Sequence, residues 1–107
     1  MELHRLEDFT GGWFVGNFHP SLMKSTAFEV SIKRYKAGES GVMHHHKIAT
    51  EFTVIVDGSA TMNGTHLISG DIVVINPGES AKFVDLSDTT TCVVKSPSVK
   101  SDKYSYE

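Results

Sequence analysis

Residues 38–58 read GESGVMHHHKIATEFTVIVDG, and they carry most of what this chain reveals about its fold and chemistry. Alternate side chains of a β-strand point to opposite faces, so His44 and His46 point the same way and His45 points away from them. The next β-rich run opens with a carboxylate, Glu51, which can turn back towards the two imidazoles. The stretch therefore predicts that two histidines and one glutamate converge on one point.

This set of side chains suits a metal ion. Two neutral imidazoles and one carboxylate can bind iron(II), manganese, nickel, cobalt or zinc, and with iron they form the facial triad of oxygenases. We therefore expect a divalent metal ion as the cofactor of His44, His46 and Glu51. The alternative is a metal-free pocket in which the two histidines hydrogen-bond a ligand or Glu51, because such polar groups are costly to bury unless they are satisfied.

The spacing within residues 38–58 resembles the first motif of the cupin superfamily. Gly38 is followed after five residues by His44, after one more by His46, after four by Glu51 and after six by Gly58. The resemblance implies an antiparallel double-stranded β-helix, also called a cupin barrel or jelly roll, with two sheets and a mouth at one end. The chain looks like the small stand-alone cupins.

Residues 70–85, GDIVVINPGESAKFVD, supply most of the second cupin motif. They contain its Gly-Asp opening, its apolar strand and a Pro77-Gly78 turn. The family has its fourth metal ligand, a histidine, at the position occupied here by Ala81. With three ligands, more coordination positions are left to water or substrate, which favours an open site over a closed structural one.

The remaining pattern also indicates an all-β fold. No run of ten or more residues has a convincing helical period, and turn signals recur about every 8 to 12 residues, as in β-sandwiches and barrels. Asn63-Gly64 predicts a tight type I′ hairpin. We expect one cupin domain over residues 1–107, with residues 97–107 as an arm laid over its body. Strands are expected within residues 13–18, 28–33, 44–46, 51–56, 59–62, 65–68, 71–76, 81–84 and 90–95.

Two further residues are candidates for ligand binding. In a regular strand Asp85 shares a face with Ala81 and Phe83 and points into the barrel. Phe83 would then form an apolar wall for a small ligand, as Trp13 or Phe14 could, and plain core packing is the alternative role for these aromatic residues. Asp85 is a candidate general base or substitute metal ligand, and otherwise an aspartate at a strand end.

Composition limits the partners. The chain has 107 residues and a net charge of −3, so it lacks the basic surface of a nucleic-acid binder. Its most basic run, residues 33–36, is expected at a solvated strand end. With neither a run of about 20 apolar residues nor a signal peptide, the chain is expected to be cytoplasmic and not bound to membranes. Cys92 is the single cysteine, so no intrachain disulfide forms.

Residues 51–56 are apolar on both strand faces, which a sheet with one solvated face would not require. Either another strand layer or a second subunit is therefore expected to cover the outer face. The resemblance to cupins, which commonly pair through such a sheet, implies a homodimer. Function is expected to involve a small-molecule ligand in the barrel. One hypothesis is a metal-dependent enzyme acting on a small carbohydrate or organic acid, and the other is a non-catalytic binding or sensor protein, since a fold alone does not define an activity.

Overall fold

The computed structural model describes residues 1–39, 41 and 43–105, and the architecture in these residues is almost entirely β. Two short 3-10 turns, η1 (Leu6–Asp8) and η2 (Thr10–Gly12), precede the first strand. The strands are β1 (Trp13–Val15), β2 (Glu29–Tyr35), β3 (His44–His46), β4 (Thr50–Asp57), β5 (Ser59–Met62), β6 (Thr65–Ile68), β7 (Ile72–Ile75), β8 (Ser80–Ala81), β9 (Phe83–Asp85), β10 (Thr89–Ser96) and β11 (Lys103–Ser105).

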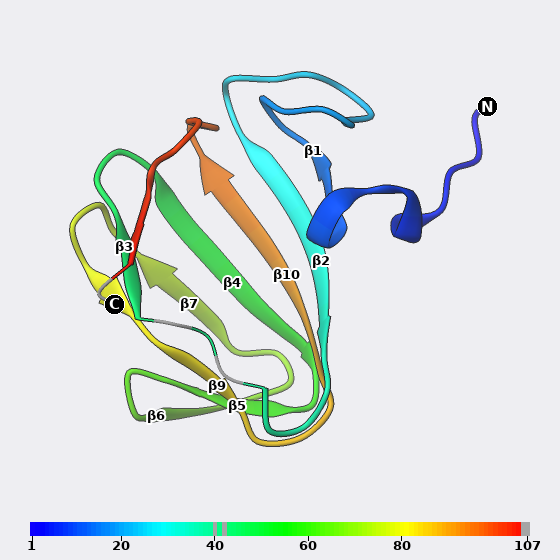
Figure 1. Ribbon diagram of the computed structural model, residues 1–107. Coiled ribbons are helices and arrows are strands. Elements are labelled where there is room, and N and C mark those ends of the chain that lie inside the picture. Colours follow the sequence, from blue (N-terminus) through cyan, green and yellow to red (C-terminus); the bar gives the residue numbers. More distant parts are fainter. Residues whose placement is uncertain (40, 42, 106–107) are drawn as a thin grey trace.

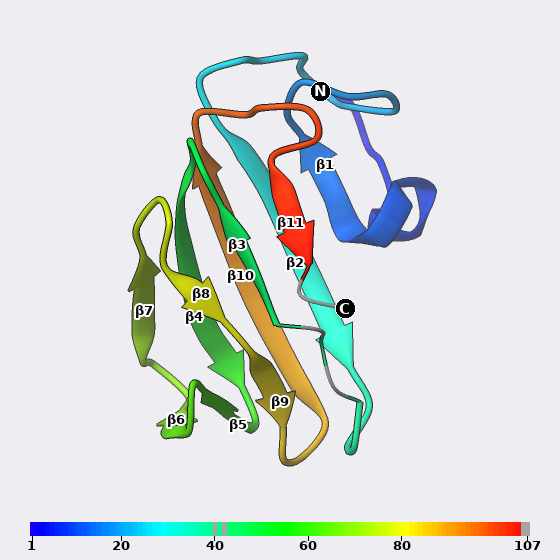
Figure 2. The same cartoon turned by 60° about the vertical axis from the view of Figure 1, so that its left-hand side comes forward.

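The strands form two layers (Figures 1 and 2). One layer is an antiparallel sheet in the order β1-β2-β10-β4-β7, and the other consists of two smaller antiparallel sheets, β11-β3-β8 and β6-β5-β9. Figure 2 shows β3, β8 and β11 lying across the face of the larger sheet. This is the double-stranded β-helix that the sequence predicts, and it places β3 and β4 on opposite walls of one interior.

The hairpin between the two motifs forms where it was predicted. β5 and β6 pair from Ser59↔Ile68 to Met62↔Thr65, with Asn63 and Gly64 as the two turn residues. Both turn residues have positive φ, 53° and 81°, as a type I′ turn requires. The short turn fixes the strand register, so Leu67 is buried and its neighbour His66 is exposed.

Two predicted strands differ from the observed ones. The first ends at Val15 because the chain turns at Gly16, whose N–H group donates to Ser21 Oγ at 3.1 Å instead of to a neighbouring strand. The predicted strand 81–84 is split, because Asn63 binds the main chain of Lys82 through two hydrogen bonds of 2.9 and 3.1 Å. The split lets β8 pair with β3 while β9 pairs with β5.

The interior is more polar than the sequence suggests. β2 alternates as predicted, but its polar face points into the barrel, where Ser31 is fully buried and Lys33 and Tyr35 line a cavity. The basic run 33–36 is therefore not simply a solvated strand end. In β4 Thr53 and Ile55 are buried, whereas Phe52 on the other face is exposed.

An apolar core fills the part of the barrel formed by β4 to β8. Its buried members are Ile55, Ala60, Met62, Leu67, Ile75 and Ala81.

The C-terminal segment corrects a prediction: it crosses the body as expected, but residues 103–105 form strand β11, which pairs with β3 (Figure 2). Residues 106 and 107 of the predicted arm lie outside the described part of the chain, as do residues 40 and 42 of the first motif. No described helix is long and apolar enough to cross a membrane.

Candidate metal centre

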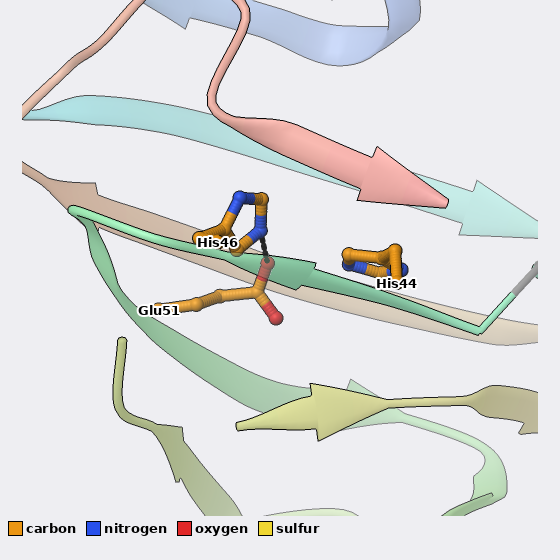
Figure 3. Close-up of side chains that lie close together, drawn as sticks. All are labelled: His44, His46 and Glu51. Atoms are coloured by element: carbon orange, nitrogen blue, oxygen red, sulfur yellow. Dashed lines mark ion pairs between the residues drawn. The ribbon is translucent and has the colours of Figure 1, made fainter. Parts of the chain in front are cut away.

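The fold brings together the three side chains that the sequence singles out (Figure 3). His44 and His46 lie on the same face of β3, and Glu51 reaches them from the start of β4. One ligand atom from each of the three side chains lies within 4.8 Å of the others. His46 and Glu51 are buried, with exposed fractions of 3% and 7%, whereas His44 is half-buried. Within the described residues, this is the only such group of three or more potential metal ligands.

The hydrogen bonds of His46 define which nitrogen can bind a metal. Its Nδ1 lies 2.9 Å from the main-chain carbonyl oxygen of Asp102. A carbonyl oxygen only accepts hydrogen bonds, so Nδ1 carries the proton and donates it. In the neutral ring the lone pair is then on Nε2, and the carbonyl fixes the ring orientation as second-shell groups do in metal sites.

The contact between His46 and Glu51 fits a bound cation. The His46 Nε2 atom is buried, has no hydrogen-bond partner among the described residues and lies 3.6 Å from Glu51 Oε1. A neutral imidazole nitrogen and a carboxylate oxygen both present lone pairs, so this arrangement is unfavourable unless a proton or a metal ion lies between them. The other carboxylate oxygen, Oε2, accepts a hydrogen bond of 3.2 Å from the Thr53 hydroxyl, which orients the group.

Electrostatics keep the carboxylate ionised. Burial alone would raise the pKa of Glu51, but the contact with the His46 ring and the positive charge of Lys95 outweigh it and hold the pKa below its ordinary value. An ionised carboxylate is the form that binds a metal ion. Glu51 therefore has the right protonation state for a ligand at neutral pH.

Ala81 supplies no metal ligand to this site. It lies opposite His44 in the β3–β8 pairing, is buried and packs in the apolar core. Asp85 is 1% exposed, but it belongs neither to the three-residue group nor to the lining of the cavity beside it. Its role as a ligand-binding residue, general base or substitute metal ligand stays a prediction.

A cavity of about 200 Å³ adjoins the three-residue group. It is lined by His44 and Glu51 from the cluster, and also by Phe83, which contacts Tyr35 with ring centroids 5.0 Å apart. Trp13 is a lining residue as well. The remaining lining residues are Lys33, Tyr35, Gly41, Thr53, Met62, Thr91, Val93, Lys95 and Lys103.

The other histidines lie apart from the cluster. His45 points to the opposite side of β3, as expected, but it is half-buried and stacks on Tyr104 of β11, with ring centroids 5.3 Å apart. His4, His19 and His66 are exposed. Sequence reasoning missed Asp102, whose carboxylate accepts hydrogen bonds from the main-chain N–H groups of residues 47–49, immediately after the histidines. Its position, more than fifty residues further along the chain, gives no local signal.

Similar folds occur among solved structures. A conserved protein from Klebsiella pneumoniae with a double-stranded β-helix domain matches 97% of this chain and 90% of its own, at a TM-score of 0.72 and 16% identity. The DMSP lyase DddQ from Ruegeria pomeroyi matches 88% of this chain at a TM-score of 0.73 and 17% identity, and the matched part is 49% of that enzyme. Bacillus subtilis oxalate decarboxylase, with Mn(II) centres, matches 77% of this chain and 25% of its own, at a TM-score of 0.67 and 18% identity.

Neither a protein-family model nor a curated protein matches the sequence. At these identities the solved structures establish the fold, and that fold is the one implied by the two sequence motifs. The chain thus has an all-β double-stranded β-helix fold, with a candidate His-His-Glu metal centre inside it.

Proposed function

We propose that residues 1–107 form a single cupin domain that binds a divalent metal ion through His44, His46 and Glu51 and holds a small organic molecule in the adjoining cavity. The observation that carries the proposal is the buried His46 Nε2 atom, which faces Glu51 Oε1 at 3.6 Å without a hydrogen-bond partner among the described residues. The Mn(II) centres of the oxalate decarboxylase support a metal of this kind. Manganese, iron, nickel, cobalt and zinc all suit the ligand set.

Such a metal could bind an oxygen atom of the ligand and polarise it, or lower the pKa of a bound water molecule. The protein's own residues would supply the rest of the site. Glu51 and His46 are held in place by Thr53 and Asp102, while the cavity beside His44 and Glu51 leaves room for the ligand. The cavity is smaller than the 300 Å³ or more of typical pockets for drug-sized ligands, which favours a small molecule.

Elemental analysis of untagged protein tests the metal site. We expect close to one divalent ion per chain in the wild type and none in the His44→Ala/His46→Ala double variant, because two of the three ligands are then removed. The exposed His66 provides the control, since His66→Ala should retain the metal. A wild type that cannot be loaded with manganese, iron, nickel, cobalt or zinc would contradict the proposal.

The second candidate function is non-catalytic binding, in which the cavity holds its ligand without converting it. One observation favours it: Glu51 is the only carboxylate among the described residues that line the cavity, so a metal-bound Glu51 leaves no second carboxylate there as a general base. Under the enzyme version, the loaded wild type turns over a carbohydrate or organic acid and the His46→Ala variant does not. Under the binding version, ligand affinity survives metal removal and no product forms.

We also propose that the chain forms a homodimer through the outer face of its larger sheet. The outward side chains of β4 and β7 include exposed Phe52, Val56, Ile72 and Val74. A second copy packed on these apolar side chains would remove apolar surface from water. Sedimentation of a Phe52→Glu/Val74→Glu variant should give a monomer where the wild type gives a dimer. A wild type that sediments as a monomer would refute this assembly.

A further inference from the structure

Three lysines from separate strands line the cavity next to the metal centre: Lys33 of β2, Lys95 of β10 and Lys103 of β11. The chain as a whole is acidic, with a net charge of −3 and ten Lys and Arg residues. The charged groups that line this cavity have the opposite balance, because Glu51 is the only acidic residue among them. Positive charge is thus concentrated where a ligand would lie.

Trp13 lies between two of these lysines. The Nζ atoms of Lys33 and Lys95 are 5.0 and 4.9 Å from the indole ring centroid, within the range of a cation–π interaction. The ammonium groups of Lys33, Lys95 and Lys103 make no ion pair within 4.0 Å with any described carboxylate. Lys33 makes one long contact with an oxygen atom, 3.4 Å from its Nζ to the carbonyl of Gly11.

The convergence of these charges is unfavourable in the absence of an anion. Burial lowers the pKa of Lys33, and the neighbouring ammonium groups of Lys103 and Lys95 lower it further. Burial also lowers the pKa of Lys95, and the positive charge of Lys103 lowers it further. The negative charges of Glu29 and Glu51 raise this pKa but do not outweigh the lowering. An anionic group placed among the three lysines would offset their repulsion with charge-assisted hydrogen bonds.

We infer that the ligand is a small organic acid, whose anionic group is bound by Lys33, Lys95 and Lys103 beside Trp13 while its other end faces His44 and Glu51. The inference rests on the proposed function, because it uses the metal centre to place the second end of the ligand. A carboxylate and a phosphate share the required chemistry, since lysine binds either as a point charge. A neutral sugar of the same size would leave the lysines without a counter-charge.

Trp13 is the single tryptophan of the chain and contacts two of the lysines, so its fluorescence reports binding directly. The experiment titrates glycerate, glycerol phosphate and glycerol into metal-loaded protein and into protein stripped of metal with a chelator, with the metal content measured in each sample. Glycerate or glycerol phosphate should change the Trp13 emission saturably, and added salt should weaken the effect because it screens charges. Whichever acid binds more tightly identifies the anionic group. Glycerol should produce no change.

Lysine variants test which residues bind the anion. Lys95→Met and Lys103→Met should each weaken acid binding roughly tenfold or more, as expected for the loss of a hydrogen bond to a charged group. Lys47→Met is the matched control, because its Nζ lies 4.4 Å from the Tyr104 ring and it does not line the cavity. Lys103 is exposed, so its variant decides the question if Lys95→Met does not fold.

The outcomes separate this inference from the metal proposal. Three results would overturn the anion site even if the protein binds metal. They are equal responses to glycerol and the acids, no response to either acid, and equal acid affinities in Lys103→Met and Lys47→Met. Lysine-dependent binding of an acid by a protein that takes up no metal would support the anion site and overturn the metal centre.

Discussion

The carboxylate of Asp102 ties the C-terminal segment to the loop that follows the histidines, and its removal is a sharp test of how the site is held. One oxygen accepts hydrogen bonds from the N–H groups of Lys47 and Ile48 at 3.1 and 3.2 Å, and the other accepts from Ile48 and Ala49 at 3.2 and 2.9 Å. Burial alone would raise the pKa of Asp102, but these hydrogen bonds outweigh it and hold the pKa below its ordinary value. Asp102 is therefore an ionised anchor, and Asp102→Ala should release the loop.

The size of the effect follows from the exposure of the three donors. Lys47 and Ile48 are exposed, so in the variant their N–H groups can bind water, and each lost hydrogen bond costs about 1 kcal/mol. Ala49 is 2% exposed, and its N–H group loses its partner outright, at a cost of about 2 kcal/mol. We expect Asp102→Ala to lower the free energy of unfolding by about 4 kcal/mol, a large part of the 5–15 kcal/mol typical of a domain.

Urea unfolding followed by Trp13 fluorescence measures this loss, with the free energy extrapolated linearly to water. Asp71→Ala is the control, because Asp71 Oδ2 accepts a single main-chain hydrogen bond, from Ile68 at 2.8 Å, and its loss should cost about 1 kcal/mol. Metal affinity, measured in parallel, should fall in the Asp102 variant alone. The main-chain carbonyl of residue 102 orients His46, and it would shift once the side chain no longer ties this segment to the loop. If the two variants were equally stable, Asp102 would not be the anchor described here.

Three further predictions concern the barrel interior and its turns. Gly58→Ala should destabilise the protein more than Gly64→Ala does: both glycines have positive φ, but a Cβ at Gly58 would overlap the Asp88 carbonyl oxygen, whereas a Cβ at Gly64 meets no atom within 4 Å. Equal losses on thermal unfolding would count against this. Asp85→Asn should stabilise the fold by about 1–3 kcal/mol in urea unfolding, because both oxygens of this buried carboxylate lack a hydrogen-bond partner among the described residues; a loss of stability would show that the charge is compensated. Burial, with the charges of Glu51 and Asp85, raises the pKa of Tyr35 to about 12. The contribution of the protonated Tyr35 to stability is therefore complete below about pH 10 and is lost as the pH rises towards 12. Tyr35→Phe should reduce this alkaline loss of stability. A Tyr35→Phe variant with an unchanged alkaline profile would contradict that assignment.

Much of the fold and the convergence of the three candidate ligands could be predicted, because those features depend on local patterns. Strand parity places His44 and His46 on one face, and the Asn63-Gly64 turn fixes the register of its hairpin. The three ligands lie within eight consecutive positions, 44–51, so only one turn of the chain separates them. Whether they bind a metal, and whether Phe83 or Asp85 contributes to ligand binding, remain predictions.

The lysines and the anchor could not be predicted, because they depend on pairing between distant strands. Lys33 and Lys95 come to line the same cavity only when β2 pairs with β10, and Lys103 joins them only when β11 pairs with β3. The alternation in β2 was also misleading. An apolar alternation normally marks the interior face, but here the polar face, with Ser31 and Lys33, points inwards.

The central claim is that a divalent ion lies between the buried nitrogen of His46 and the carboxylate of Glu51. Anomalous diffraction at the zinc absorption edge, from crystals grown with zinc, tests it most directly. The account predicts an anomalous peak at about 2.0–2.2 Å from His46 Nε2, Glu51 Oε1 and an imidazole nitrogen of His44. The absence of a peak there, with His46 Nε2 and Glu51 Oε1 drawn into a direct hydrogen bond through a shared proton, would contradict it.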